Sequence, residues 1–246
     1  MSDTLTSRFF VQSDPVTRKL VVDIPREWWS RFYEYEWASR FCESGDVALD
    51  AGCGLGHPFK FHLADVCREA HACDLDPAIH MLNDKDHLAR TFRDFGCPDP
   101  DGLTRRYLNK VRYACCSITD LPYENKKFDK VYCISVLEHL PVRDISLSLR
   151  EFQRTLKDDG LIVLTLDYPT VDLRLLTSVA AELGLAFAGD VSLTKPADAV
   201  YSRLYNLYCF RAVLRKQPQR PKFEEPEPPK HQEPERPKPL TIYCSF

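Results

Sequence analysis

The sequence lacks the features that mark several large classes of protein. It has no run of about 18 uncharged apolar residues, the length that a membrane-spanning helix needs, and its first 14 residues lack the basic-then-apolar pattern of a signal peptide. Its formal net charge is only -3, so a surface built mainly to bind a phosphate backbone is not expected. These absences predict a cytoplasmic protein with no membrane span and no nucleic acid as its main partner.

Paired cysteines at metal-ligand spacing are also lacking. The chain has 10 cysteines, but no two of them form a C-x-x-C pair, and no Cys/His cluster has the spacing of zinc ligands. Most of the cysteines lie inside apolar runs, as the reduced, buried thiols of cytosolic proteins do. We therefore predict neither a disulfide framework nor a metal site.

Composition divides the chain into residues 1–44, 45–216 and 217–246. Residues 217–239 hold 8 of the 18 prolines among charged residues, which predicts an extended tail with little to bury. This tail is either a solvated spacer or a docking peptide for a partner protein with an aromatic groove. Residues 25–40 hold all three tryptophans. We expect a helical aromatic cover there, which either shields one edge of the domain or forms a pocket wall with Tyr33 and Trp37 near a substrate.

Between residues 45 and 216, short apolar runs alternate with runs of helical spacing. We expect strands over 47–50, 70–74, 111–116, 128–135, 160–166, 185–193 and 204–214. We expect helices over 58–69, 77–90, 142–156 and 171–183, and a loop-rich insertion over 94–110. Strands separated by helices of about a dozen residues predict βαβ units, and hence a parallel sheet with helices on both faces.

The strongest chemical signal is the glycine cluster LDAGCGLG over residues 49–56. The chain has only 9 glycines, and three of them, Gly52, Gly54 and Gly56, occupy alternate positions here. Glycine is needed where a ligand touches the backbone, because a Cβ would collide or forbid the dihedral angles. Exposed N–H groups and the following helix N-terminus would suit a phosphate or a zwitterionic amino acid. By itself the cluster predicts a nucleotide-binding fold in general.

Three later motifs end at the same edge of the predicted sheet. Asp74, in ACDLDP, follows the second strand, where a carboxylate can accept hydrogen bonds from both ribose hydroxyls. Ser117 and Ile118, in SITDLPY, follow the third strand, and Ser135, in FDKVYCISVLEHL, follows the fourth. Ligands of open α/β sheets lie beyond the carboxyl ends of the strands, so the motifs converge on one crevice.

Together, DAGCGLG, ACDLDP, ITDLPY, FDKVYCISVLEHL and LKDDGLIVLTL resemble a class I S-adenosylmethionine-dependent methyltransferase over roughly residues 45–216. The resemblance implies a Rossmann-like α/β fold with a seven-stranded sheet whose last strand, 204–214 here, is antiparallel. It also implies S-adenosylmethionine as cofactor. The implied contacts are Asp50, Gly52, Cys53, Gly54 and Gly56 at the methionine end, Asp74 at the ribose, Leu75, Ser117 and Ile118 at the adenine, and Ser135 at the sulfonium.

Two positions depart from the family pattern. Ser117 stands where many members carry an aspartate that accepts from the adenine amino group, so this contact would be uncharged here. His57 follows the glycines where small residues are more usual. It either reaches the cofactor carboxylate or simply begins the next helix.

The reaction implied by the resemblance places few demands on catalytic side chains. In-line methyl transfer needs alignment and exclusion of water, and it needs a general base only where the acceptor loses a proton. Glu138 and His139 follow the fourth strand and are the candidates for that base, although His139 is alternatively a loop-stabilising residue. Asp167 and Tyr168 follow the fifth strand, and they either contact the acceptor or cap the next turn.

The methyl acceptor is the least determined feature. Basic residues gather at Arg105, Arg106, Lys110 and Arg112, as an RNA-modifying enzyme would need, but such strips are usually solvated surface. The aromatic N-terminal run favours a closed pocket and hence a small-molecule acceptor. RNA or protein methylation stays an alternative, as does a cofactor-binding regulator or assembly protein that acts through residues 217–239.

Overall fold

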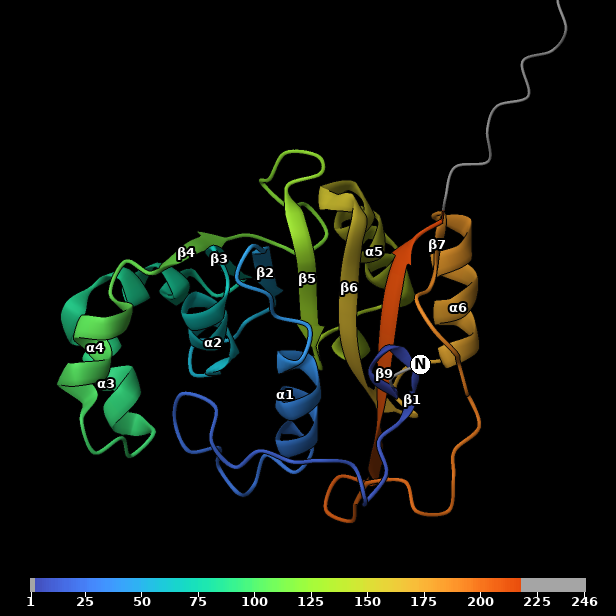
Figure 1. Ribbon diagram of the computed structural model, residues 1–246, viewed down its shortest axis with the longest axis horizontal. Helices are drawn as coiled ribbons and strands as arrows, with labels where there is room; N and C mark the ends of the chain where they lie inside the picture. The colour runs from blue at the N-terminus through green and yellow to red at the C-terminus, as the bar shows by residue number, and fades with distance from the viewer. Residues whose placement is uncertain (1–2, 218–246) are drawn as a thin grey trace, which may run out of the picture.

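The computed structural model describes residues 3–217, and the predicted proline-rich tail from residue 218 onward lies outside the described residues. A nine-stranded sheet forms the centre of this part of the chain (Figure 1). Its strands are β1 (Arg8–Phe9), β2 (Val47–Ala51), β3 (Glu69–Asp74), β4 (Val111–Cys115), β5 (Phe128–Ile134), β6 (Leu156–Tyr168), β7 (Leu185–Phe187), β8 (Tyr201–Ser202) and β9 (Leu207–Lys216).

The strand order is β1-β9-β6-β5-β2-β3-β4, and β7 and β8 also pair with β9. Strands β2 to β6 are parallel, whereas β9 runs antiparallel to β6, which confirms the predicted antiparallel last strand. The predicted number of seven strands was wrong, because β1 and β8 are added along β9. Each of these has only two residues, too few for any apolar period to be read from the sequence.

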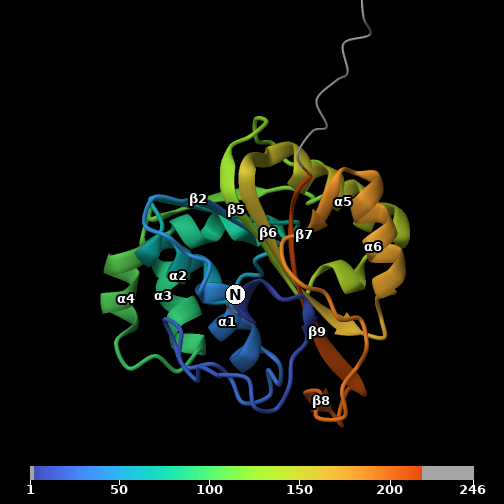
Figure 2. The same ribbon diagram turned by 45° about the vertical axis from the view of Figure 1, so that its right-hand side comes forward.

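Helices cover both faces of the sheet. They are α1 (Arg31–Ser39), α2 (Phe59–Val66), α3 (Lys85–Asp94), α4 (Pro100–Tyr107), α5 (Val142–Thr155) and α6 (Leu173–Glu182), with short 3-10 helices η1 (Asp3–Leu5), η2 (Pro77–Asn83) and η3 (Leu137–His139). Figure 2 shows α5 and α6 on one side and α1 to α4 on the other. Two apolar cores therefore lie between the helices and the sheet. One is under α5 and α6, and the other, which is rich in aromatic rings, is under α1 and α2.

Three predicted segments differ from the structure. The strand predicted over 185–193 is limited to β7, Leu185–Phe187. The predicted loop-rich insertion contains α4, because the Asp99 side chain accepts from the N–H of Gly102 at 2.8 Å and Pro100 suits the first helical turn. The predicted helix over 77–90 is divided into η2 and α3 at Asp84, which caps the start of α3. The prolines and aspartates of this region therefore begin helices rather than loops.

The predicted aromatic cover forms α1, which packs on the same face of the sheet as α2. Its side chains Tyr35 and Trp37 are buried with Phe59 and Tyr132 in the aromatic core. Within residues 3–217, no helix combines the length and the hydropathy that a bilayer crossing requires.

Candidate functional site

The glycine turn joins β2 to α2. Gly52 has φ +74° and Gly54 has φ +57°, a backbone region that strains any residue with a side chain. The N–H groups of Gly52 and Cys53 both donate to the carbonyl of Cys73, at 2.9 and 3.0 Å, and that of Gly54 donates to Oδ2 of Asp74 at 2.7 Å. The prediction that the N–H groups of this part of the turn are free for a ligand was therefore wrong. They tie the turn to the end of β3 instead.

A lysine beneath the turn holds its carbonyls. Lys60, on α2, is completely buried, and its Nζ donates to the carbonyls of His57 and Gly54 at 2.5 and 2.7 Å. A longer contact of 3.4 Å reaches the carbonyl of Cys53. Burial lowers the pKa of Lys60. The sequence analysis missed this residue, and the only available signal was a lysine inside the apolar run PFKFHLA.

Asp50, at the end of β2, is a buried carboxylate with an open oxygen. Its side chain is 3% exposed, and its Oδ2 has no hydrogen-bond partner. Burial raises the pKa of Asp50 to about 7, although the charge of Lys60 opposes this shift. Native proteins rarely leave such an oxygen unpaired, so this position suits a ligand that brings a donor or a positive charge.

The ends of β3 and β4 bring three more predicted residues close together. Asp74 accepts from the N–H of Asp76 through Oδ1 at 3.0 Å, while the N–H of Cys116 donates to the Asp74 carbonyl at 3.0 Å. Ser117, next to Cys116, makes a hydroxyl contact of 2.7 Å with Thr119, and Ile118 is buried. The side chain of Leu75 is 72% exposed, which leaves a large apolar surface beside these polar groups.

Ser135, at the carboxyl end of β5, is joined to α1. It has φ +49°, unusual for a residue other than glycine. Its Oγ donates to Oε1 of Glu34 at 2.6 Å and accepts from Nη1 of Arg31 at 2.8 Å. Arg31 also pairs with Glu34, which is wholly buried, and the Cys209 thiol donates to Glu34 at 3.2 Å.

The sequence analysis missed Arg31 and Glu34 altogether. Burial by itself would raise the pKa of Glu34, but Arg31 and Ser135 hold it below its usual value. The only sequence signal was a basic and an acidic residue three positions apart inside the aromatic run. Their contact to a residue more than 100 positions away had no sequence signal.

Glu138 and Asp167 meet at the ends of β5 and β6. Oε1 of Glu138 accepts from the N–H of Asp167 at 3.3 Å, but Oε2 of Glu138 and Oδ1 of Asp167 have no partner among residues 3–217. Burial raises the pKa of Glu138 to about 8 and that of Asp167 to about 6. Asp167 pairs in register with Cys209, so both side chains lie on the α1 side of the sheet. His139, the other predicted base, is exposed.

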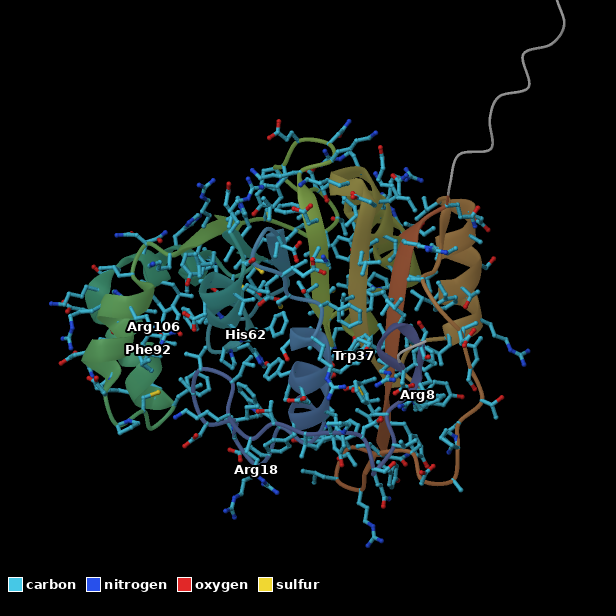
Figure 3. The ribbon with its side chains drawn as sticks, viewed as in Figure 1. Arg8, Arg18, Trp37, His62, Phe92 and Arg106 are labelled. Atoms are coloured by element: carbon cyan, nitrogen blue, oxygen red, sulfur yellow. The ribbon has the colours of Figure 1, made fainter. Side chains whose placement is uncertain are left out.

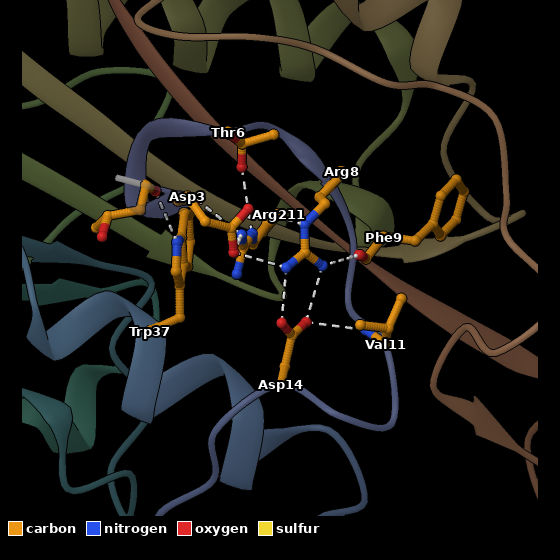
Figure 4. A network of polar contacts seen from close by, with 9 residues as sticks. Asp3, Thr6, Arg8, Phe9, Val11, Asp14, Trp37 and Arg211 are labelled. Carbon is orange, nitrogen blue, oxygen red and sulfur yellow. Dashed lines mark hydrogen bonds and ion pairs between the residues drawn. The ribbon is translucent and has the colours of Figure 1, made fainter. Parts of the chain in front are cut away.

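Three of the predicted substrate contacts do not meet in this crevice. Tyr168 alternates with Asp167 along β6, so it points to the other face, where it packs edge-on against Phe9. Trp37 is buried, its Nε1 donates to the carbonyl of Thr4 at 3.0 Å, and it lies beside the network of Asp3, Arg8, Asp14 and Arg211 (Figure 4). Tyr33 packs against Phe10. The structure therefore places Tyr168 and Trp37 away from these groups.

The aromatic run nevertheless reaches the glycine turn through two other residues. Oη of Tyr35 hydrogen-bonds Nδ1 of His57 at 2.8 Å, and the Trp28 ring stacks on the His57 ring at 4.3 Å. Burial lowers the pKa of His57 to about 3, so this imidazole is neutral near neutral pH. The N-terminal segment thus forms an aromatic wall against the turn.

The basic residues near the predicted insertion are partly neutralised. Arg106 pairs with Asp65 and Arg112 pairs with Glu69, each at 2.9 Å. Figure 3 places Arg106 at the α3–α4 end of the molecule, apart from Trp37 and Arg8. Two of the four basic residues therefore already have acidic partners within the chain.

Comparison with known proteins gives a family match and several distant curated relatives. The family described as "Methyltransferase domain" matches residues 49–164. A sphingolipid C9-methyltransferase of Candida albicans is 25% identical over 125 residues, which are 50% of this chain and 22% of that protein. An uncharacterized protein of Methanocaldococcus jannaschii is 26% identical over 117 residues, 48% of this chain and 39% of its own. The chain thus spans less than half the length of these curated relatives.

Solved structures of similar fold include methyltransferases and also a [4+2]-cyclase, SpnF. One is the 1,6-didemethyltoxoflavin-N1-methyltransferase of Burkholderia thailandensis with bound 1,6-didemethyltoxoflavin and S-adenosylhomocysteine. It is 17% identical with a TM-score of 0.52, over 78% of this chain and 82% of that chain. A TehB-like S-adenosylmethionine-dependent methyltransferase of Corynebacterium glutamicum is 18% identical with a TM-score of 0.51, over 75% and 87%. At such identities the likeness concerns the fold.

Proposed function

We propose that the chain transfers a methyl group from S-adenosylmethionine to a small molecule, starting from the match of residues 49–164 to the family described as "Methyltransferase domain". The observation that carries the proposal is a set of buried polar atoms without partners at the carboxyl ends of β2, β5 and β6. Among the described residues eight buried side-chain atoms lack a partner, and three of them belong to Asp50, Glu138 and Asp167. Unpaired buried atoms are costly, so their gathering at one crevice favours a ligand there.

The proposed cofactor matches these groups in charge and in donors. Its methionine end, with an ammonium group and a positive sulfur, would lie by Asp50, the backbone of Gly52, Cys53, Gly54 and Gly56, and Ser135. Both Asp74 oxygens hold one backbone N–H each, and a carboxylate oxygen can accept a second hydrogen bond from a ribose hydroxyl. Leu75, Ser117 and Ile118 would border the adenine.

Methyl transfer requires few further contributions from the residues of the chain. When bound, the cofactor supplies a methyl group made electrophilic by the positive sulfur. The chain's own residues orient this end, through the turn held by Lys60, and exclude water with the wall of Trp28, Tyr35 and His57. A small-molecule acceptor accords with this wall, and the relatives named above include enzymes named for a sphingolipid and for 1,6-didemethyltoxoflavin.

Calorimetry with S-adenosylhomocysteine tests the proposal. We expect binding to the full chain, and a loss of about 10- to 100-fold in affinity in Asp74→Ala, because the variant removes the acceptor of the Gly54 N–H together with the proposed ribose contact. Asp158→Asn is the matched control, since Asp158 is an exposed aspartate paired with Lys126 and should keep full affinity. Absence of binding to the unaltered chain would refute the function, and equal affinity in Asp74→Ala would refute the ribose assignment. Release of S-adenosylhomocysteine from S-adenosylmethionine with candidate acceptors then reports turnover.

A further inference from the structure

Three acidic side chains lie near one another beside Ser135, but within residues 3–217 an ion pair joins only one of them to a cation. Glu34 is bound by Arg31, by Ser135 and by the Cys209 thiol. Glu138 accepts from the backbone N–H of Asp167 at 3.3 Å, and its side chain is 8% exposed with an Oε2 that has no partner among residues 3–217. Asp167 likewise has an unpartnered Oδ1. Arg31 is thus paired with Glu34, and within residues 3–217 no ion pair joins Glu138 or Asp167 to a cation.

The charges facing this pair come from each element packed against it. For Glu138 the like charges of Asp167 and Glu34 add to the effect of burial, whereas a hydrogen bond from its own backbone N–H and the charge of Arg31 oppose it; the result is a pKa of about 8. For Asp167 the same Glu34 and Arg31 act, and its pKa lies near 6. Two carboxyl groups with open oxygens and raised pKa values are short of positive charge and of hydrogen-bond donors.

An ammonium group meets both needs better than a hydroxyl does. It brings a charge and up to three donors, enough for Oε2 of Glu138 and Oδ1 of Asp167 together, whereas a hydroxyl brings one donor and no charge. The place in the fold also fits an acceptor. Glu138 follows Ser135 by three residues, and Asp167 is the last residue but one of the neighbouring strand β6.

We propose that Glu138 and Asp167 form the binding subsite for an amine of the methyl acceptor, with Glu138 as the base; this inference rests on the function proposed above. The bound ammonium first gives one proton to the Glu138 carboxylate. The freed nitrogen lone pair then forms the bond to the methyl carbon, and the electron pair of the broken carbon–sulfur bond stays on sulfur. The methylated ammonium keeps its charge beside Asp167, and the proton on Glu138 passes to solvent.

Sinefungin is a probe that needs no knowledge of the natural acceptor. It carries an amine on the carbon that replaces the methylated sulfur, so its extra group enters the space between cofactor and acceptor, whereas S-adenosylhomocysteine leaves that space empty. The ratio of the two dissociation constants isolates the contribution of this amine. In the full chain we expect sinefungin to bind at least about 10-fold more tightly than S-adenosylhomocysteine at pH 7.5.

Variants of Glu138 and Asp167 test whether these residues cause the preference for sinefungin. Glu138→Gln should bring the ratio to within about 2-fold of one while the affinity for S-adenosylhomocysteine stays within about 3-fold, and Asp167→Asn should reduce the ratio in the same direction. Glu182→Gln, an exposed acidic residue at the end of α6, should leave it unchanged. Circular dichroism establishes that each variant folds, and if Glu138→Gln does not, the ratio in Asp167→Asn decides.

The possible failures are distinguishable. A ratio near one in the unaltered chain, with tight binding of S-adenosylhomocysteine, overturns the amine subsite and leaves the methyltransferase proposal standing. A ratio that persists in both variants also overturns the subsite, because the preference would then come from other groups. Absence of binding by either nucleoside overturns the proposed function and the subsite with it.

Discussion

Replacement of Lys60 by methionine removes the charge beneath the glycine turn while keeping a long, unbranched side chain. The ammonium of Lys60 is completely buried and donates to the carbonyls of Gly54 and His57 at 2.7 and 2.5 Å. Methionine cannot donate, so both carbonyls would lose this donor in the interior. The variant therefore tests whether this lysine, absent from the motif pattern, shapes the turn.

The expected magnitude comes from two opposing effects. A buried carbonyl left without its donor costs about 1–3 kcal/mol, so two of them cost about 2–6 kcal/mol in the free energy of unfolding. Relief from burying an ammonium offsets part of this, because desolvation of an ion costs several kcal/mol. We expect a net loss of about 2 kcal/mol. We also expect the affinity for S-adenosylhomocysteine to fall by about 10-fold or more, since the turn would no longer be held in its bound shape.

Urea unfolding followed by circular dichroism measures the first effect, and calorimetry measures the second. Lys126→Met is the matched control, because Lys126 forms an exposed ion pair with Asp158 and its loss should change stability by less than about 0.5 kcal/mol. Equal or greater stability of Lys60→Met, together with unchanged affinity, would refute the view that the lysine positions the turn.

Two further predictions concern the same turn. Gly54→Ala should lower the free energy of unfolding by about 2 kcal/mol, because a Cβ at φ +57° would lie 2.6 Å from the His57 ring. Gly45→Ala is the control and should be nearly neutral, because the space around Gly45 is open. Equal effects of the two substitutions in urea unfolding would contradict the reasoning. Burial raises the pKa of Asp50 from 3.8 to about 7, so the folded chain binds more protons than the unfolded chain between these values. The stability of the unaltered chain relative to Asp50→Asn should therefore fall as the pH rises from 4 to 7 and level off above it. A difference that is flat across this range in urea unfolding would show that the Asp50 carboxyl is not shifted.

Patterns confined to neighbouring residues predicted much of the fold. The run into the glycine cluster, the apolar run of β6 and the helical spacing of α5 each lie within one element, and each was located to within a few residues. The pairs of residues that begin helices were harder to interpret. Asp99 with Pro100 looked like a loop in the sequence, and only the cap on Gly102 shows that it starts α4.

The residues of the candidate site likewise fall into those that local sequence patterns predicted and those that they did not. The sequence predicted Asp50, Asp74, Ser135, Glu138 and Asp167 because each follows a strand, and parallel strands end at one edge of a sheet. It did not predict the direction in which Tyr168 points, since a side chain's face depends on the register of β6 with β9. Nor did it predict that Trp37 belongs to the core.

The sequence by itself determined the class of fold and the edge of the sheet where chemistry is expected, because apolar period and glycine placement act over a few residues. Only the tertiary structure decided that Arg31 and Glu34 meet Ser135, that Lys60 is buried under the turn, and that two carboxyl groups lack cations. These contacts join residues up to 104 positions apart, and the burial that shifts their charges arises only when separate elements pack together.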